Sequence, residues 1–234
     1  MKIIPAIDLM NKKVVRLLKG NPDTKKIYSD DPYKIAKMWE NQGADMIQFV
    51  DLDAALGLGS NLSIIKKTID KLTIPSLIAG GLRNEHLIRE ALELSSGIIL
   101  GTVPFTNKKL LQKFVDYKDK IIISIDQISR IIVINGWKNK TNIKISEGMK
   151  DLIKFGFSNF LLTNVEKDGT LEGIDIDLFY DVCKINSTHI FAAGGISNLN
   201  DVKKLENANV AGIVLGKVLY EGLLTINDIK KACH

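Results

Sequence analysis

The sequence predicts an α/β protein folded as a (β/α)₈ barrel, the TIM barrel fold. Short apolar runs alternate with amphipathic stretches eight times along 234 residues, which is the order of elements in a parallel sheet with helical crossovers. Eight such units in this length fit a closed barrel better than an open sheet. The sequence contains no linker or low-complexity segment, so we expect one domain over residues 1–234.

The eight predicted strands are short, rich in β-branched residues and free of polar alternation. This pattern is typical of parallel strands that are buried on both faces. The runs cover residues 3–7, 46–50, 74–79, 97–101, 121–125, 159–163, 190–193 and 212–216.

Each strand is followed by a stretch with helical periodicity. The first has Pro32 in its first turn and Gly43 at its end, which are start and stop signals of a helix. The predicted helices cover residues 31–43, 61–72, 84–94, 106–117, 146–156, 176–185, 198–208 and 225–233.

The second half of the chain repeats features of the first. KIIPAID at 2–8 and KIIISID at 120–126 share K-I-I-x-x-I-D, and A-G-G follows both the third and the seventh strand. The fourth and eighth strands both read G-I-x-L-G. Chance similarity between apolar strands would not place aspartates and glycines at matching positions. We therefore expect two similar half-barrels, at about 1–118 and 119–234.

Composition excludes several functional classes. Hydrophobic residues make up 45% and charged residues 25%, as in ordinary globular proteins. Cys183 and Cys233 lie in no C-x-x-C pattern, so neither a disulfide framework nor a zinc site is expected. The net charge of +5 is spread over helix faces with only 6% aromatics, which argues against nucleic-acid binding. The surplus of positive charge favours an anionic substrate.

The start of the chain does not resemble a secretory signal, and no apolar run reaches the roughly 18 residues of a membrane span. We therefore expect a cytoplasmic protein.

Glycines at the carboxyl ends of four strands predict two phosphate sites. Barrels of this kind hold catalytic groups at these ends and often bind phosphate after strands seven and eight. Glycine there lets backbone N–H groups approach an anion. The candidates are Gly195, Gly216 and Lys217 on one side, and Gly81, Gly101 and Thr102 on the other. Two such sites indicate a substrate with a phosphate at each end.

Asp8 and Asp126 end the first and fifth strands, so they face each other across the barrel mouth. Either one alone would be interpreted as a turn former or a helix cap. At equivalent strand ends between two phosphate sites, they are candidates for a general base and a general acid. We expect no metal at the site. His86, His189 and His234 are poorly placed for catalysis.

Five more polar or aromatic residues lie near strand ends, and three of them have a structural alternative. Asp168, in K-D-G-T, is either a turn former or a site residue. Arg83 either starts a helix or binds phosphate, and Trp137 either anchors a loop or stacks on a planar ring. Arg16 lies on the first loop, which could close over an anion, and Thr163 ends the sixth strand.

Together these motifs resemble the phosphoribosylformimino aminoimidazole carboxamide ribotide isomerases of histidine biosynthesis. The matching stretches span the chain and read PAIDL, VRLxxG, VDLDAA, GGxR, NGW, EKDGT, AAGGIS and LYEG. The resemblance implies a two-fold repeated barrel without metal or organic cofactor. It also implies a substrate with two phosphoribosyl groups and an Amadori rearrangement of an aminoaldose to an aminoketose.

The resemblance implies a role for each candidate. Asp126 would be the acid that opens the ribose ring, and Asp8 the base that takes the C2 proton. Thr163 and Asp168 would support them, and Arg16, Arg83 and Trp137 would contact substrate. The phosphates would lie at the six residues named above. The chain departs from the family at Gln127–Ser129, where an Arg is common, at Lys217, where Arg is common, and at Asn164, where an acidic residue is common.

Three alternatives remain open. The cyclase subunit of the next pathway step shares the half-barrel plan but typically opens with C-L-D and needs a glutaminase partner. A dual-specificity isomerase would also accept phosphoribosylanthranilate, and a non-catalytic barrel would only bind phosphometabolites. We expect a small bisphosphate substrate, no nucleic acid, membrane or obligatory protein partner, and a monomer.

Overall fold

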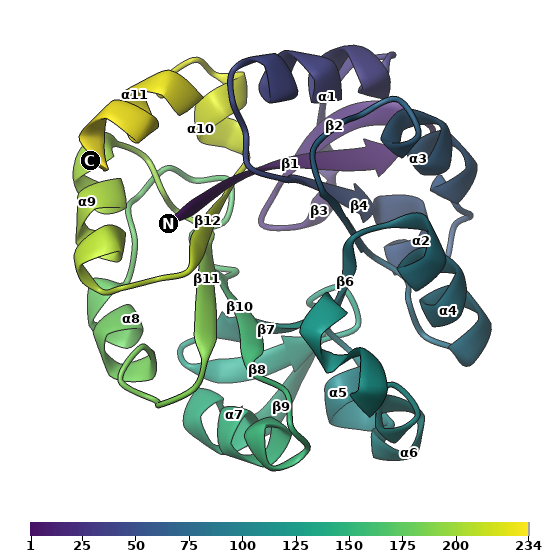
Figure 1. Ribbon diagram of the computed structural model, residues 1–234, viewed down its shortest axis with the longest axis vertical. Coiled ribbons are helices and arrows are strands. Elements are labelled where there is room, and N and C mark those ends of the chain that lie inside the picture. Colours follow the sequence, from purple (N-terminus) through teal and green to yellow (C-terminus); the bar gives the residue numbers. More distant parts are fainter. Residues whose placement is uncertain (234) are drawn as a thin grey trace.

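The computed structural model describes residues 1–233 and shows a closed barrel of eight parallel strands ringed by helices (Figure 1). The strands pair in the order β10-β11-β12-β1-β4-β5-β6-β7, and β7 pairs with β10 to close the barrel. The fold prediction is therefore confirmed. The barrel strands are β1 (Lys2–Met10), β4 (Ile47–Asp51), β5 (Ser76–Ala79), β6 (Gly97–Leu100), β7 (Ile121–Ile128), β10 (Asn159–Asn164), β11 (His189–Ala193) and β12 (Gly212–Leu215).

A helix follows each strand at the predicted place. Asp31 begins the first by accepting a hydrogen bond from the Lys34 N–H, and Pro32 occupies its first turn. These helices are α1 (Pro32–Asn41), α3 (Leu62–Ile69), α4 (Glu85–Leu94), α6 (Lys108–Gln112), α7 (Ile145–Lys154), α8 (Ile176–Val182), α9 (Leu199–Asn207) and α11 (Ile226–Ala232).

The helix predicted over 106–117 was wrong in length. It ends at Gln112, and a 3₁₀ helix, η1 (Val115–Lys120), carries the chain to β7. The N–H groups of Lys113 and Phe114 donate to carbonyls three residues back rather than four, which tightens the last turn and stops the α-helix.

Seven elements were not predicted. Two hairpins extend antiparallel from β1 and β7, and their outer strands are polar and largely exposed, so they lack an apolar run. Three short helices follow strand ends directly. The elements are β2 (Lys13–Leu18), β3 (Asn21–Ser29), β8 (Ile131–Ile134), β9 (Asn139–Lys144), α2 (Leu52–Leu56), α5 (Val103–Thr106) and α10 (Lys217–Tyr220).

The core has two layers because side chains alternate along each strand. In β1, Ile3 and Ile7 pack between the strands and the helices, whereas Ile4 and Ala6 fill the barrel interior. Asp8 continues the interior series, so the alternation itself points its carboxylate into the barrel mouth. Trp39 is buried in the outer layer.

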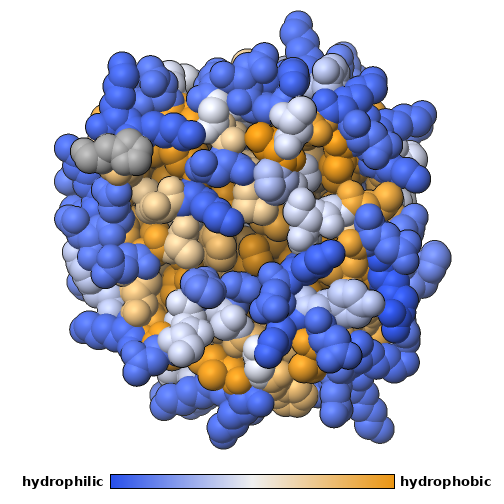
Figure 2. Space-filling view, viewed as in Figure 1, coloured by the Kyte–Doolittle hydropathy of each residue, from blue (hydrophilic) through white to orange (hydrophobic). Residues whose placement is uncertain are grey.

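Hydrophilic side chains cover the outer helices around the whole rim of the face seen in Figure 2, with apolar residues between them. This agrees with a net charge that is spread over the helices. In residues 1–233, no helix is long and apolar enough to span a membrane.

Candidate active site

One cavity at the carboxyl ends of the barrel strands brings all the predicted site residues together. Its walls come from the strand ends, the two hairpins and the starts of α5 and α10. The predicted residues that line it are Asp8, Arg16, Gly81, Arg83, Gly101, Thr102, Asp126, Trp137, Thr163, Asp168, Gly195, Gly216 and Lys217.

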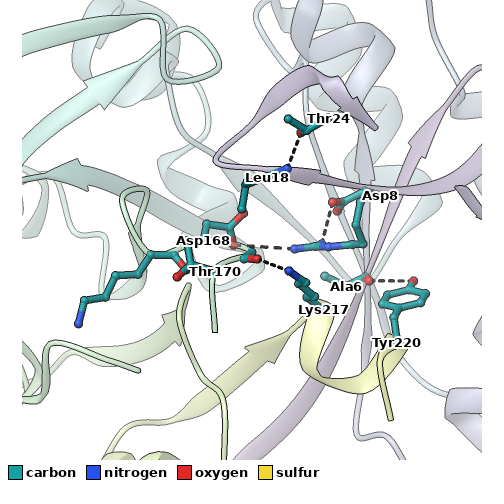
Figure 3. Close-up of polar contacts among 11 residues, drawn as sticks. Ala6, Asp8, Leu18, Thr24, Asp168, Thr170, Lys217 and Tyr220 are labelled. Carbon is teal, nitrogen blue, oxygen red and sulfur yellow. Dashed lines mark hydrogen bonds and ion pairs between the residues drawn. The ribbon is translucent and has the colours of Figure 1, made fainter. Parts of the chain in front are cut away.

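Asp8, Arg16 and Asp168 form a buried charge cluster in this cavity (Figure 3). Arg16 Nη1 donates to Asp8 Oδ2 over 2.7 Å, and its Nη2 lies 3.8 Å from Asp168 Oδ1. All three side chains are less than one-fifth exposed. Antiparallel pairing of β1 with β2 sets Asp8 opposite Val15, beside Arg16. A Cβ at Gly216 would overlap the Arg16 guanidinium, so a side chain here would displace the arginine from its present position.

Burial sets the charge state of Asp8. Loss of solvent raises its pKa to about 6, although the Arg16 guanidinium opposes the rise, and the nearby Asp168 adds to it. Burial also raises the pKa of Asp168, against the effect of Arg16. Asp8 is therefore ionised at neutral pH yet basic enough to accept a proton, which suits a general base.

Asp126 lies in a different environment, without a cationic partner among the described residues within salt-bridge distance. Burial raises its pKa, and polar contacts with Ser124, Trp137 and Thr163 partly offset the rise. Ser124 Oγ donates to Asp126 Oδ1 over 2.8 Å. The other oxygen, Oδ2, faces Gly101, where an added Cβ would lie 3.6 Å away. One oxygen is thus fixed, and the other is turned toward the side of the cavity that Gly101 lines.

The sequence did not single out Ser124. Its signal was the alternation of the strand: Ser124 precedes Asp126 by two residues and shares its face. We expect Ser124→Ala to raise the Asp126 pKa further, because the substitution removes a hydrogen bond to the charged form. An NMR titration of the Asp126 carboxyl would measure this. Thr106→Ala, at the exposed end of α5 and outside the cavity, is the control, and an unchanged Asp126 pKa in Ser124→Ala would contradict the assignment.

The two hairpins meet over the mouth. The Trp137 ring packs against Gly20 at the β2–β3 turn, where a Cβ would lie 2.6 Å from Trp137 Cε3. Trp137 itself has a φ of 69°. The Asn135 N–H donates to Thr102 Oγ1 over 3.0 Å, which ties the β8–β9 turn to the end of β6. Trp137 thus closes one side of the cavity.

The K-D-G-T loop contacts the first hairpin and the end of β12. Lys217 Nζ donates to the Gly169 carbonyl over 2.9 Å (Figure 3). The Lys19 N–H donates to the Asp168 carbonyl over 3.2 Å. The side chain of Lys19 does not line the cavity. Arg83 does line it and donates to the Ala55 carbonyl over 2.5 Å. Arg83 does not begin α4, because Asn84 is the N-cap.

The glycine pairs after β5 and β11 have matching backbones. Gly80 and Gly81 have φ of 94° and 71°, and Gly194 and Gly195 have 82° and 91°, all in the left-handed region. A Cβ at Gly80 or Gly194 would collide with a backbone carbonyl of the preceding strand end, from Asp51 or Asn164. The starts of α5 and α10, at Thr102 and Gly216, have no side-chain cap hydrogen bond. Both ends of the cavity therefore offer backbone groups to an anion.

Other polar strand-end residues lie outside the cavity. Asp51 caps α2, and Asp51 and Asp53 both accept from Asn61, in a buried network that also holds the turn between β1 and β2. His86 and His189 are exposed and do not line the cavity, and His234 lies outside the described residues. Within residues 1–233, no group of three or more His, Cys, Asp or Glu is arranged to hold a metal ion.

The fold and the site define a (β/α)₈ barrel with a pair of buried carboxylates and two pairs of glycines at its mouth. Residues 2–225 match the family described as histidine biosynthesis protein, and the chain belongs to that family. It is 46% identical over 233 residues, 99% of both chains, to a protein of Nitrosopumilus maritimus (strain SCM1). That relative is named 1-(5-phosphoribosyl)-5-((5-phosphoribosylamino)methylideneamino) imidazole-4-carboxamide isomerase.

Relatives of the same name occur in other lineages. One from Cenarchaeum symbiosum (strain A) is 42% identical over 228 residues, 97% of both chains. One from Caldanaerobacter subterraneus subsp. tengcongensis is 37% identical over 235 residues, covering 99% of this chain and 96% of its own. The similarity thus extends along the whole barrel.

Proposed function

We propose that this chain is the isomerase of histidine biosynthesis that converts the bis-phosphoribosyl aminoaldose to the aminoketose. The single observation that carries the proposal is that the buried carboxylates of Asp8 and Asp126 share one cavity with two matching pairs of glycines. Such a mouth fits a substrate with a phosphate at each end. The whole-length similarity to isomerases of this name supports it.

Ring opening is the first proposed step. Asp126, protonated, gives its proton to the ribose ring oxygen as the bond from that oxygen to C1 breaks, and the nitrogen lone pair forms a C1=N Schiff base. Burial supports this role because it raises the pKa of Asp126 and so favours the protonated form. Ser124 holds the other carboxylate oxygen, and Thr163, its partner in the β7–β10 pairing, supports the acid.

Proton transfer from C2 is the second step. Asp8 takes the C2 proton, the C–H electrons form a C1=C2 bond, and the C=N electrons return to nitrogen, giving an enolamine. Loss of the proton from the C2 hydroxyl and gain of one at C1 then give the ketose. Arg16 supports this step by holding Asp8 ionised and oriented, and Asp168 holds Arg16 from the other side.

The remaining predicted residues are proposed to bind the substrate. One phosphate would lie at the Gly81, Gly101 and Thr102 end and the other at the Gly195, Gly216 and Lys217 end. Arg83 and Trp137 line the cavity wall and would contact the substrate. The Trp137 indole would stack on a planar part of the ligand. The proposed enzyme is a monomer that requires no cofactor, nucleic acid, membrane or protein partner.

Arg16→Met is expected to move the pH dependence of kcat/KM. In the unmodified chain, activity rises with pH through about 6 as Asp8 ionises. Removing the guanidinium removes the charge that lowers the Asp8 pKa, so this limb moves to higher pH and activity at pH 7 falls about 10-fold or more. Activity would recover in part above pH 8. A limb that stays near pH 6 in the variant would contradict the role of Arg16.

The proposal is tested by offering three substrates to the purified chain. We expect turnover of the aminoaldose, measured by its absorbance change. We expect no turnover of the aminoketose in the presence of ammonia, which is the reaction that the cyclase would catalyse. Turnover of phosphoribosylanthranilate as well would indicate the dual-specificity alternative. A folded chain that binds the aminoaldose without converting it would indicate a non-catalytic binding barrel and would overturn the proposed isomerase function.

A further inference from the structure

Gln48 is a buried amide in the cavity to which the proposed mechanism gives no role. Ile47 and Phe49 pack against the helices, so the alternation of β4 points Gln48 into the barrel interior, between Met46 and Val50. Gln48 is 7% exposed and lines the cavity floor.

The amide oxygen of Gln48 has no partner. Among the described residues, no donor lies within hydrogen-bond distance of its buried Oε1. Buried polar atoms in folded proteins are nearly always paired, because an unpaired one keeps the cost of its lost hydration. The rest of the floor is mainly apolar, formed by residues such as Ala79, Ile99 and Leu161. An apolar residue would pack there without the cost of lost hydration. The presence of an amide therefore indicates that a group of the ligand pairs with it.

The two aspartate-bearing strands show what such a floor residue does. In the β7–β10 pair, Ser124 lies opposite Leu161, and its hydroxyl bonds to Asp126. In the β1–β4 pair, Ala6 lies opposite Gln48. The polar floor residue here is therefore on β4, beside the strand that carries Asp8, and not on the same strand as the aspartate. Asp8 already has Arg16 as its partner. The Gln48 amide is thus next to the Asp8 strand but not engaged by it.

We propose that Gln48 is a specificity-determining residue that binds the oxygen on C2 of the sugar at which Asp8 acts. The inference rests on the proposed function and deepens it. In the aldose this oxygen is a hydroxyl, which can donate to Oε1; in the ketose it is a carbonyl, which can accept from the amide NH₂. An amide has both groups and no charge, so it fits both forms. A carboxylate or an ammonium fits only one.

The test compares Gln48→Leu and Gln48→Met with Ser76→Ala. Ser76 on β5 is a matched control, because its Oγ is also buried and unpartnered but does not line the cavity. We expect both Gln48 variants to lose kcat/KM for the aminoaldose by about 10-fold or more, with an unchanged or higher Tm. Ser76→Ala should retain wild-type turnover.

A second readout separates contact with the C2 oxygen from a change of shape. The analogue of the aminoaldose that lacks the C2 hydroxyl cannot react, and its inhibition constant should be the same for wild type and Gln48→Leu. Inorganic phosphate should likewise inhibit both equally. Wild-type turnover in Gln48→Leu, or weaker binding of the deoxy analogue by that variant, would overturn the inference alone. An inactive wild-type chain would overturn the proposed function, and this inference with it.

Discussion

Asp126→Asn is expected to lower kcat/KM for the aminoaldose by about 10²–10⁴-fold, the range that general acid catalysis contributes. The amide keeps the shape of the side chain and its contact with Ser124, but it has no proton to give to the ring oxygen. Binding should change little, since asparagine is close in size to the aspartate that it replaces. Steady-state kinetics with circular dichroism of the variant would measure both.

Asp70→Asn is the matched control for this substitution. Asp70 is exposed at the end of α3 and outside the cavity, so its variant should turn over like wild type. A folded Asp126→Asn with wild-type kinetics would exclude Asp126 as the acid.

Asp8→Asn is expected to lower kcat/KM for the aminoaldose by a similar factor, but for a different reason. The ring still opens, but the C2 proton has no base to accept it, so the Schiff base accumulates. Cyanoborohydride reduces such an imine to a stable amine. We therefore expect mass spectrometry to detect the reduced open-chain amine with Asp8→Asn and not with Asp126→Asn. The opposite pattern would reverse the two assignments.

The sequence predicted what depends on periodicity and on turns. The eight buried strands appear as apolar runs, and both aspartates end runs that repeat each other. The glycine pairs were equally predictable, because residues 80 and 194 require a positive φ and a close approach of neighbouring backbone. These features are local in the chain, and a local pattern encodes them.

The features that the sequence did not predict depend on contacts distant in the chain. In the hairpins β2–β3 and β8–β9, the outer strands β3 and β9 are polar and exposed, so these two strands show no apolar run. Arg16 was a candidate, but its position between Asp8 and Asp168 depends on two separate loops that meet only in the fold. Gln48 is a single polar residue within an apolar strand, and such a residue gives no distinct signal in the sequence. Its position in the wall of the cavity is seen only in the closed barrel.

In the proposed mechanism, Asp126 and Asp8 act in successive steps on one bound substrate. The most direct measurement is kcat/KM of the double variant Asp8→Asn/Asp126→Asn beside the two single variants. When two groups serve successive steps, the slower step sets the rate and the losses do not multiply. We predict a double variant within about tenfold of the slower single variant. A folded double variant whose loss equals the product of the two single losses would contradict the successive action of the two carboxylates.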